Sequence, residues 1–332
     1  MNPSEKAASS HPVIRTLTSP AGRALLALLL VLLVGLIFNA DGAFFRPGTH
    51  RDALRQASVY GILACGLTLV IITAGIDLAV GSVLALVAVC GAKMAIHWHW
   101  PAVVVVVASL LVGAACGGTC GFVAARLRVQ PFIATLAMMV FARGLAKYAS
   151  GGMKVSRSFG GEFVDLPPLF AFIDKRILGD NVSMVSVIFL GCVVLAWLAL
   201  DRHRWGRQLY AIGGNEDAAR LSGVPVVAAK AAAYVASGVF AAIAGLCQAA
   251  QEQQGDPETG GGYELIAIAM VVIGGTSLMG GRGGMGLTLL GVLTIGYLEK
   301  ILSINAVPEA GRLMLTGLII VVAVLTQRRR PA

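Results

Sequence analysis

Long apolar runs recur along the whole chain and dominate what it can fold into. Ten of them approach the roughly 20 residues that an α-helix needs to cross a membrane. Charged residues make up only 13% of the 332 residues, about half the share that a soluble domain carries. The sequence therefore predicts an all-α integral membrane protein with about ten transmembrane helices. These are expected at residues 22–40, 56–74, 78–96, 102–125, 130–150, 182–200, 228–249, 263–279, 285–303 and 310–327.

Basic residues outside these runs predict the orientation, because cytoplasmic loops of membrane proteins are enriched in Lys and Arg. They gather at both ends of the chain and in one loop after the sixth run. We expect a cytoplasmic tail at 1–21, a transmembrane domain at 22–327 with a cytoplasmic loop at 201–227, and a basic cytoplasmic tail at 328–332. The net charge of +9 then reflects these loops facing anionic membrane lipid, and not a nucleic-acid partner.

No pattern predicts a cofactor, a metal or a catalytic centre. The six cysteines lie in apolar stretches without a CxxC pair, which is typical of small buried residues. His97 and His99 alternate with tryptophans, as expected at a membrane interface, and no third ligand is near. The GRGGMG run at 281–286 has the glycine spacing of a dinucleotide site but follows a membrane-length apolar segment instead of a strand. Because the chain also lacks GxxxxGK[ST], any ATP hydrolysis belongs to another subunit.

A carboxylate interrupts the apolar pattern between the second and third runs, which only Gly75, Ile76 and Asp77 separate. Glycine often follows a helix end, and aspartate is a favoured N-cap that also suits the positive end of a helix dipole. Asp77 is therefore expected to cap the third helix. A role in the substrate path or in gating is the alternative, since carboxylates inside membranes are costly and often functional. The two roles are compatible.

Other polar side chains within the runs extend that alternative. They include Gln130 and Thr135 in the fifth run and Gln248, Gln251 and Glu264 around the outer ends of the seventh and eighth. The default interpretation is snorkelling or loop solvation, and a polar translocation path is the other. The fourth run instead predicts close helix packing, because small residues recur every fourth position, at Gly113, Gly117 and Gly121.

A short capped helix is predicted inside the loop at 201–227. Asn215 is a good N-cap, Glu216 suits the first turn, Arg220 the last turn, and Gly223 the position just past the end. Such a helix at the membrane surface fits a groove on a partner protein. The alternative is a well-capped loop helix that only faces solvent.

A weak internal repeat is also indicated. Asp77 and the turn at 276–286 each interrupt a pair of apolar helices, and many transporters are built from repeats with broken helices at matching positions.

Five stretches, taken together and in order, resemble one family. They are GIDLAVGS (75–82), PFIATLA (131–137), FARGLA (141–146), YAIGGNEDAARLSGVPV (210–226) and YELIAIAMVVIGGTSLMGGRGGMGLTLLG (263–291). From residue 55 to the C-terminus, their order and spacing are similar to those of the permease subunits of bacterial ABC importers for ribose and related monosaccharides. Each motif alone is weak, whereas all five in order are specific to this family.

The resemblance implies an inner-membrane subunit that works with an ABC ATPase subunit, a periplasmic sugar-binding protein and a second permease, identical or different. It implies that the loop at 210–226 docks on the ATPase. The coupling helix would then comprise Gly214, Asn215, Glu216, Ala219, Arg220 and Gly223.

The resemblance also makes Asp77 and Ser82 candidates for a role at the pathway. Three positions depart from the family pattern. Ile266 stands where an acid is common, and Ala79 and Met279 stand where serine is common. The missing acid weakens any transfer of substrate range to this chain.

We therefore predict the permease subunit of an ATP-driven importer for a monosaccharide such as ribose. One alternative is an ion-coupled transporter with Asp77 or Glu264 as its ion site, and another is an ABC permease for a small furanose-like ligand that is not a sugar. A membrane enzyme would need a catalytic constellation, and the sequence offers none. The candidate pathway or gating residues are Asp77, Ser82, Gln130, Thr135 and Glu264.

Overall fold

The computed structural model describes residues 19–159 and 162–326, so the predicted tails at 1–21 and 328–332 lie almost wholly outside the described residues. Thirteen α-helices form within them, and the all-α prediction is confirmed. They are α2 (Pro20–Ile37), α3 (Pro47–Ile72), α4 (Val80–Ala92), α5 (Ala102–Gly121), α6 (Pro131–Ser150), α7 (Pro168–Asp174), α8 (Met184–Trp197), α9 (Arg204–Gly214), α10 (Glu216–Leu221), α11 (Val226–Glu252), α12 (Tyr263–Gly274), α13 (Met285–Ile304) and α14 (Glu309–Thr326).

A helix occupies each of the ten apolar ranges. Eight helical stretches in the described part of the chain are long and apolar enough to cross a membrane, whereas α12 is a shorter apolar helix. Three helices, α4, α5 and α8, continue into π-helical turns: η3 (Lys93–His97), η4 (Phe122–Arg126) and η5 (Leu198–Arg202). The total of ten spans stays a prediction.

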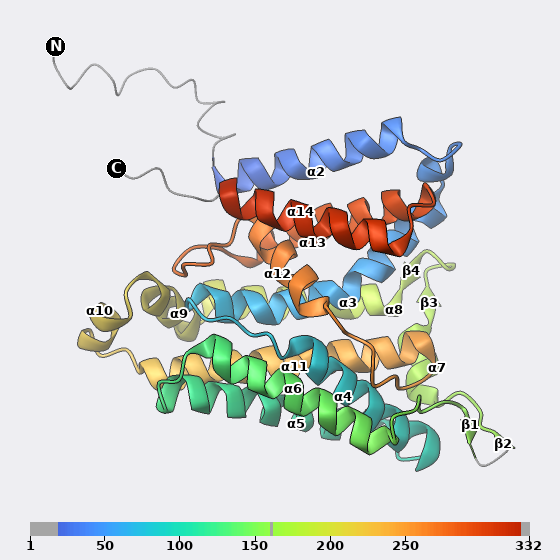
Figure 1. Ribbon diagram of the computed structural model, residues 1–332, viewed down its shortest axis with the longest axis horizontal. Coiled ribbons are helices and arrows are strands. Elements are labelled where there is room, and N and C mark those ends of the chain that lie inside the picture. The colour runs from blue at the N-terminus through green and yellow to red at the C-terminus, as the bar shows by residue number, and fades with distance from the viewer. Residues whose placement is uncertain (1–18, 160–161, 327–332) are drawn as a thin grey trace.

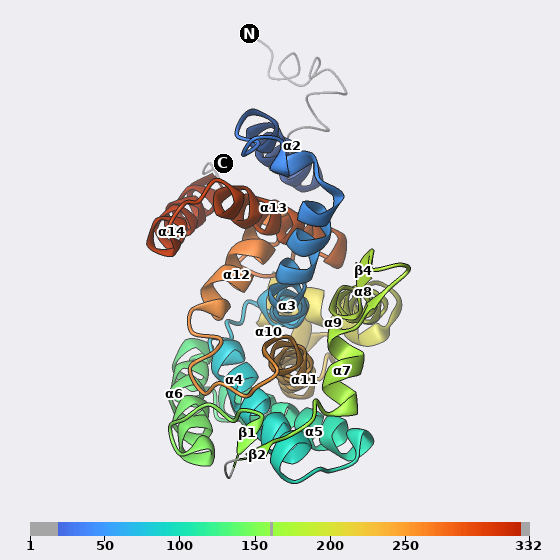
Figure 2. The same ribbon diagram turned by 90° about the vertical axis from the view of Figure 1, so that its right-hand side faces the viewer.

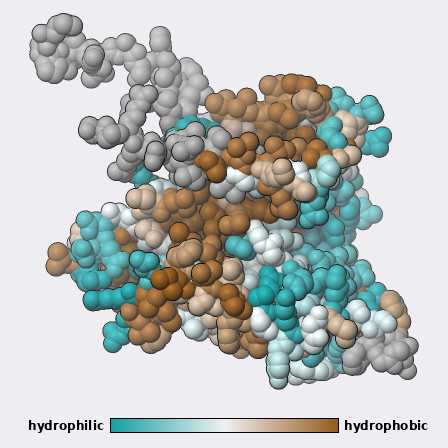
Figure 3. All heavy atoms as spheres, viewed as in Figure 1, coloured by the Kyte–Doolittle hydropathy of each residue, from teal (hydrophilic) through white to brown (hydrophobic). Residues whose placement is uncertain are grey.

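The elements outside the long helices gather at two opposite ends of the bundle (Figure 1). α9 and α10 lie at one end, where α2 begins and α14 finishes. The other end carries α7, the 3-10 turn η2 (Ala43–Phe45) and two antiparallel hairpins, β1 (Ser158–Phe159) with β2 (Glu162–Phe163) and β3 (Arg176–Ile177) with β4 (Val182–Ser183). On the face shown in Figure 3, apolar side chains cover much of the region between the ends and polar ones gather at the ends. The cytoplasmic placement of the α9–α10 end stays a prediction.

Two sets of four consecutive helices, α3–α6 and α11–α14, have matching packing partners. α3 packs against α12 and α13, as α11 packs against α5 and α4, and the pairs α4–α6 and α12–α14 also correspond. Seen from the hairpin end, α3 and α11 occupy the middle, with α2, α13 and α14 on one side and α5 and α6 on the other (Figure 2). The two central helices run in opposite directions (Figure 1), so the sets are inverted relative to each other.

Each set contains a break after its long first helix. Residues 73–79 follow α3 and residues 253–262 follow α11, and each segment turns back into the bundle before a shorter helix begins (Figure 1). The predicted repeat is therefore present, but the counterpart of the break at Asp77 is the segment 253–262 and not the predicted turn at 276–286. The turn at 276–286 only joins α12 to α13. The true counterpart was missed because 253–262 is so polar that it has the composition of an outer loop.

The two breaks are built alike and meet inside the bundle. Each long helix ends near a left-handed residue that is not glycine, Ala74 (φ 58°) in one case and Gln253 (φ 53°) in the other. The shorter helices α4 and α12 then begin side by side, since a Cβ atom on Gly81 would lie 2.3 Å from the carbonyl oxygen of Gly260.

The glycine stripe of α5 confirms the prediction of close packing. Cβ atoms on Gly113 and Gly117 would lie 2.2 Å and 2.1 Å from the carbonyl oxygens of Gly238 and Tyr234 on α11. No side chain fits between these two backbones. α11 is therefore held against α5 on one side and against α3 and α4 on others, at the centre of the bundle.

Candidate functional site

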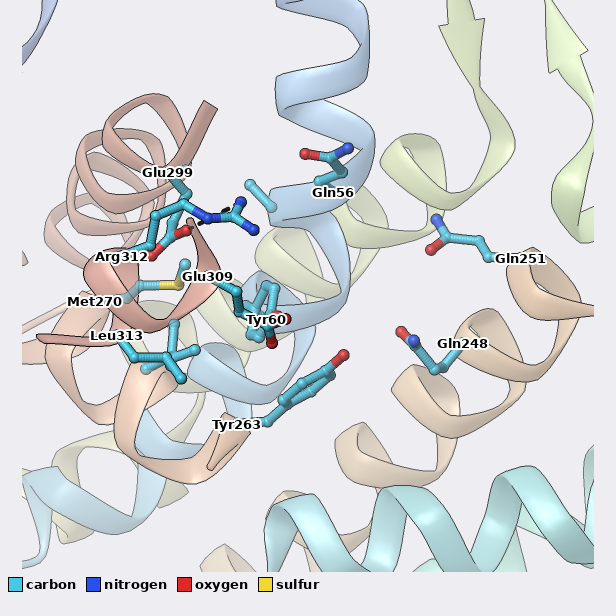
Figure 4. Close-up of a pocket in the computed structure, with 13 residues that line it drawn as sticks. Gln56, Tyr60, Gln248, Gln251, Tyr263, Met270, Glu299, Glu309, Arg312 and Leu313 are labelled. Atoms are coloured by element: carbon cyan, nitrogen blue, oxygen red, sulfur yellow. Dashed lines mark ion pairs between the residues drawn. The ribbon is translucent and has the colours of Figure 1, made fainter. Parts of the chain in front are cut away.

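A cavity of about 260 Å³ lies between five helices, next to the second break (Figure 4). Helices α3, α11, α12, α13 and α14 contribute its walls. Polar and aromatic side chains form most of the lining: Gln56, Tyr60, Gln248, Gln251, Tyr263, Glu299, Glu309 and Arg312, together with Ala57, Ile266, Met270, Gly296 and Leu313. Because Gln251 and Tyr263 flank the segment 253–262, any rearrangement of that segment moves two walls of the cavity.

Two tyrosines form an aromatic side of the cavity. The ring centroids of Tyr60 on α3 and Tyr263 at the start of α12 are 4.5 Å apart, with 47° between the ring planes. The Tyr263 hydroxyl points toward the carboxamide of Gln248 (Figure 4). Gln248 in turn donates a hydrogen bond to Glu252, one turn further along α11 (2.6 Å). The rings offer apolar faces, and the hydroxyls and carboxamides offer donors and acceptors.

A charged pair forms another side. Arg312 Nη1 lies 3.9 Å from Glu299 Oε2, and the Thr316 hydroxyl donates to Glu299 Oε1 (2.9 Å). Two donor atoms of the lining, Arg312 Nε and Gln251 Nε2, are buried and have no acceptor among the described residues. Buried donors without acceptors are rare in proteins. Their presence in one cavity indicates a place for a polar ligand.

Asp77 lies outside this cavity, in the first break, and is only 3% exposed. Ser237 Oγ on α11 donates to Asp77 Oδ2 (2.7 Å), and the Ala79 backbone N–H donates to Asp77 Oδ1 (3.0 Å). The predicted N-cap position is wrong, because α4 begins at Val80 with Ala79 as its N-cap. Asp77 instead closes a turn ahead of the helix. The non-helical segment extends two residues further than the sequence indicated.

Thr135 joins Asp77 at the first break. Its hydroxyl on α6 lies 3.3 Å from the carbonyl oxygen of Ile76, and the Tyr234 hydroxyl on α11 lies 3.4 Å from the same oxygen. The break is thus held by side chains from two helices. Gln130 does not join this group, since it is exposed at the start of α6.

Glu264 lies where the two breaks meet. It belongs to the first turn of α12, and a Cβ atom on Gly81 would lie 2.4 Å from Glu264 Oε2, so the carboxylate rests against the first turn of α4. Ser82 is buried in that same turn. Helix N-termini carry partial positive charge, which favours a carboxylate between two of them. Four of the five predicted pathway residues therefore lie at the breaks, and Gln130 does not. None of the five lines the cavity, and their role in transport stays a prediction.

The short helix predicted in the polar loop is present as α10. Asn215 Oδ1 accepts the N–H of Ala218 (2.9 Å), and Gly223 follows the helix with a left-handed φ of 82°. Gly214 ends α9 just before the cap, and Ala219 is the buried residue of α10.

Glu216 links α10 to the centre of the bundle. Its carboxylate pairs with Arg220 on the same helix (2.8 Å) and with Lys230 in the first turns of α11 (2.9 Å). Leu221, at the end of α10, is 90% exposed. The arrangement presents an apolar tip outward on a helix that is ion-paired to α11, and its role in docking stays a prediction.

Several cavity residues were not predicted from the sequence, above all Tyr60, Glu299 and Arg312. A signal was available for the charged ones, because ionisable residues inside apolar membrane-length runs are rare and mark functional sites. Glu299 lies in the run at 285–303 and Arg312 in the run at 310–327. No comparable signal distinguishes Tyr60 from an ordinary core tyrosine.

These features define a class: a polytopic helical membrane protein of transporter type, with inverted sets of broken helices and a polar cavity beside one break. Residues 51–324 match the family described as branched-chain amino acid transport system / permease component, and the chain belongs to this family of ABC importer permeases. It is a multi-pass protein of the inner membrane.

Relatives with sugars in their names resemble nearly the whole chain. The ribose import permease protein RbsC of Escherichia coli (strain K12) is 39% identical over 301 residues, 91% of this chain and 92% of that protein. The fructose import permease protein FruG of Bifidobacterium longum is 36% identical over 86% of this chain and 84% of its own length. The L-arabinose transport system permease protein AraH of Escherichia coli is 36% identical over 82% of this chain and 80% of its own length. No solved structure gives a significant match. The resemblance to ribose-type permeases is confirmed.

Proposed function

We propose that this chain is the membrane subunit of an ATP-driven importer and that a monosaccharide crosses the membrane through the cavity between α3 and α11–α14. The sugar names of its relatives support this substrate class. The observation that carries the proposal is the lining itself, where paired tyrosines face carboxamides and a charged pair, with two donors left without acceptors.

The lining suits the chemistry of a small sugar. A monosaccharide carries C–H groups that pack on aromatic faces, here those of Tyr60 and Tyr263. Its hydroxyls both donate and accept, which matches the free donors on Gln251 and Arg312 and the carboxylate of Glu299. Hydrogen bonds to the two charged groups are the stronger ones. We infer that these three polar residues orient the sugar while the tyrosines hold its ring.

Coupling to the ATPase would pass along α11. At one end of this helix Lys230 pairs with Glu216 of α10, further along Ser237 holds Asp77 in the first break, and at the other end Gln248 and Gln251 line the cavity. ATP-driven movement of a partner docked on α10 is therefore expected to shift both breaks and the cavity wall. Such a partner changes the equilibrium between outward- and inward-facing states only by its different affinity for the two.

An ion-coupled mechanism through Asp77 is less well supported. Both of its carboxylate oxygens already accept hydrogen bonds from protein donors, so an ion would have to displace them. We place the ATPase at the α9–α10 end, a second permease beside this chain in the membrane, and a sugar-binding protein at the end that carries the hairpins.

The experiment is to purify the tagged full-length chain from its host in mild detergent and identify what accompanies it. The complex, reconstituted in vesicles with its binding protein, is then assayed for ATP-dependent uptake of ribose, fructose, L-arabinose and leucine. ATP-dependent uptake of one of the sugars supports the proposal. A chain that purifies without any ATPase, or uptake of leucine alone, overturns it.

A further inference from the structure

A second cavity, wholly apolar, lies on α11 near the α9–α10 end. This groove of about 520 Å³ is lined by Trp205 on α9 and by Ala232, Val235, Ala236, Val239 and Phe240 on one face of α11. Trp205 Nε1 donates to the carbonyl oxygen of Ala229 (3.1 Å), which fixes the indole beside α11. The groove shares no residue with the cavity proposed for sugar.

Exposed arginines lie on the two elements that contact the same end of α11. One element is the start of α9, which Trp205 holds against α11. The other is η4, which follows α5 directly after Gly121, a residue packed against Ala231 of α11. Arg204 and Arg207 lie on α9, and Arg202 ends η5 just before it; Arg126 ends η4, and Arg128 follows two residues later.

None of these arginines pairs with a carboxylate among the described residues. Arg202 only stacks on the ring of Trp197, 5.4 Å from its centroid. At the opposite end of the bundle several cations are paired with carboxylates: Arg55 with Asp174, Lys147 with Glu258, Lys154 with Asp256 and Arg176 with Asp52. The groove thus has an apolar floor, and the two elements that contact this end of α11, α9 and η4, carry or adjoin arginines without a carboxylate partner in the described part of the chain.

We propose that this groove binds an anionic phospholipid, with an acyl chain along α11 and the phosphate between the arginines of α9 and η4. Guanidinium groups bind phosphate through paired, charge-assisted hydrogen bonds. An apolar groove at membrane depth is filled by hydrocarbon, since it offers nothing to water. Basic clusters beside membrane helices attract anionic lipids, whereas a zwitterionic headgroup brings its own cation and loses most of that attraction. The site shares no residue with the Glu216–Lys230 pair and does not depend on the identity of the transported substrate.

The test uses Trp205 as a probe within the groove. Replacing the other three tryptophans, Trp98, Trp100 and Trp197, by Phe leaves one indole in the full-length chain. Its fluorescence is measured in detergent with brominated phosphatidylglycerol and, separately, with brominated phosphatidylcholine. Arg204→Gln/Arg207→Gln is the test variant. Lys175→Gln, an exposed cation at the hairpin end, is the matched control.

We expect phosphatidylglycerol to quench Trp205 at a lower mole fraction than phosphatidylcholine. Each arginine removed should weaken the preference by roughly fivefold, and Lys175→Gln should leave it unchanged. Ala236→Phe, which fills the groove without touching the arginines, should reduce quenching by both lipids.

Native mass spectrometry of the wild-type chain in a mixture of the two lipids provides a second readout that needs no tryptophan replacement. It should show retained phosphatidylglycerol. Equal quenching by the two lipids together with no selective retention overturns the proposal. Displacement of the lipid by inorganic phosphate would also overturn it, because it would identify a site for a soluble anion.

Discussion

Ser237 Oγ on α11 lies 2.7 Å from Asp77 Oδ2, and this hydrogen bond ties the first break to the central helix of the bundle. The other oxygen of Asp77 accepts the Ala79 N–H, so the carboxylate holds the backbone of residues 77–79 in a turn while α11 holds the carboxylate. The aspartate is thus a structural joint between α11 and the start of α4. A movement of α11 cannot leave the break unchanged.

Substitutions at this joint should separate hydrogen bonding from charge. Asp77→Leu leaves the Ala79 N–H and the Ser237 hydroxyl without an acceptor, at about 1–3 kcal/mol for each buried group. Asp77→Asn keeps the acceptor for Ala79 and offers an N–H to Ser237. We expect Asn to lower the melting temperature of the detergent-solubilised chain much less than Leu, and Ser237→Ala to fall between them.

Ser109→Ala is the control, because Ser109 is a buried serine on α5 whose hydroxyl has no partner among the described residues. It should be nearly neutral. Equal loss of uptake in Asp77→Asn and Asp77→Leu would show that transport needs the charge itself.

Two adjacent glycines on α5 test the packing of α5 on α11. A Cβ atom at Gly117 would lie 2.1 Å from the Tyr234 carbonyl oxygen, whereas one at Gly118 meets nothing closer than a Val235 methyl group at 3.6 Å. Gly117→Ala is therefore expected to destabilise the chain by at least about 1–3 kcal/mol, because a backbone atom cannot move aside. Gly118→Ala should be tolerated. Melting curves of the two variants measure this, and similar midpoints would contradict the packing.

The Glu216–Lys230 pair tests the proposed route from α10 to α11. Glu216→Lys places two ammonium groups together, and we expect α10 to lose its attachment and the recovered ATPase to fall by about tenfold, or ~1.4 kcal/mol. The exchange variant Glu216→Lys/Lys230→Glu restores an attractive pair and should recover much of the binding. Asp217→Lys makes the same charge change on a neighbouring exposed residue and is the control. If the Glu216→Lys variant recovered as much ATPase as the wild type, the Glu216–Lys230 pair would not be part of the route from α10 to α11.

How much the sequence predicts depends on how local the signal is. The apolar runs, the capped α10 and the small-residue stripe of α5 each depend on residues close together in the sequence. Each is found where it was expected. The second break was missed because its Gln, Asp, Glu and Gly residues have the composition of solvent-exposed loops. Only tertiary contact shows that Gly260 lies against Gly81. The cavity was largely missed for the same reason, since its wall combines side chains such as Tyr60 and Arg312 from runs that are far apart in sequence.

The segment 253–262 should depend on pH through Asp256. Burial favours the neutral form, but hydrogen bonds from Lys154 (2.9 Å) and from the Glu258 N–H (2.8 Å) outweigh it and hold the pKa of Asp256 below its ordinary value of 3.8. A carboxyl group with a lowered pKa in the folded state stabilises that state above its unfolded pKa, and this contribution disappears as the pH falls through the folded value.

We therefore expect Asp256→Asn to weaken the protection of the Val155 and Gly255 amides from hydrogen exchange. These two residues join the loop after α6 to the segment 253–262 through backbone hydrogen bonds of 2.8 Å and 2.9 Å. The difference from wild type should be full at pH 7, begin to shrink only below about pH 4, and disappear once the pH has fallen below the folded pKa of Asp256. Asp180→Asn, an exposed aspartate at the same end, should have no such effect. A difference that does not shrink as the pH falls below about 4 would mean that the charge of Asp256 is not what holds the segment.

Ile266 provides the sharpest test of the cavity, because it is an apolar residue on the same wall as Tyr263 in a mainly polar and aromatic lining. Ile266→Asp would add a hydrogen-bond acceptor, and a site that accepts from a particular hydroxyl discriminates strongly against a sugar that lacks it. We expect the variant to change the ratio of uptake among ribose, fructose and L-arabinose by about tenfold or more, a difference of ~1.4 kcal/mol. Ile266→Asn separates the charge from the change in size, and Ile266→Leu keeps the wall apolar. Unchanged ratios in an Ile266→Asp variant that inserts and binds its ATPase normally would show that the sugar does not pass along this wall.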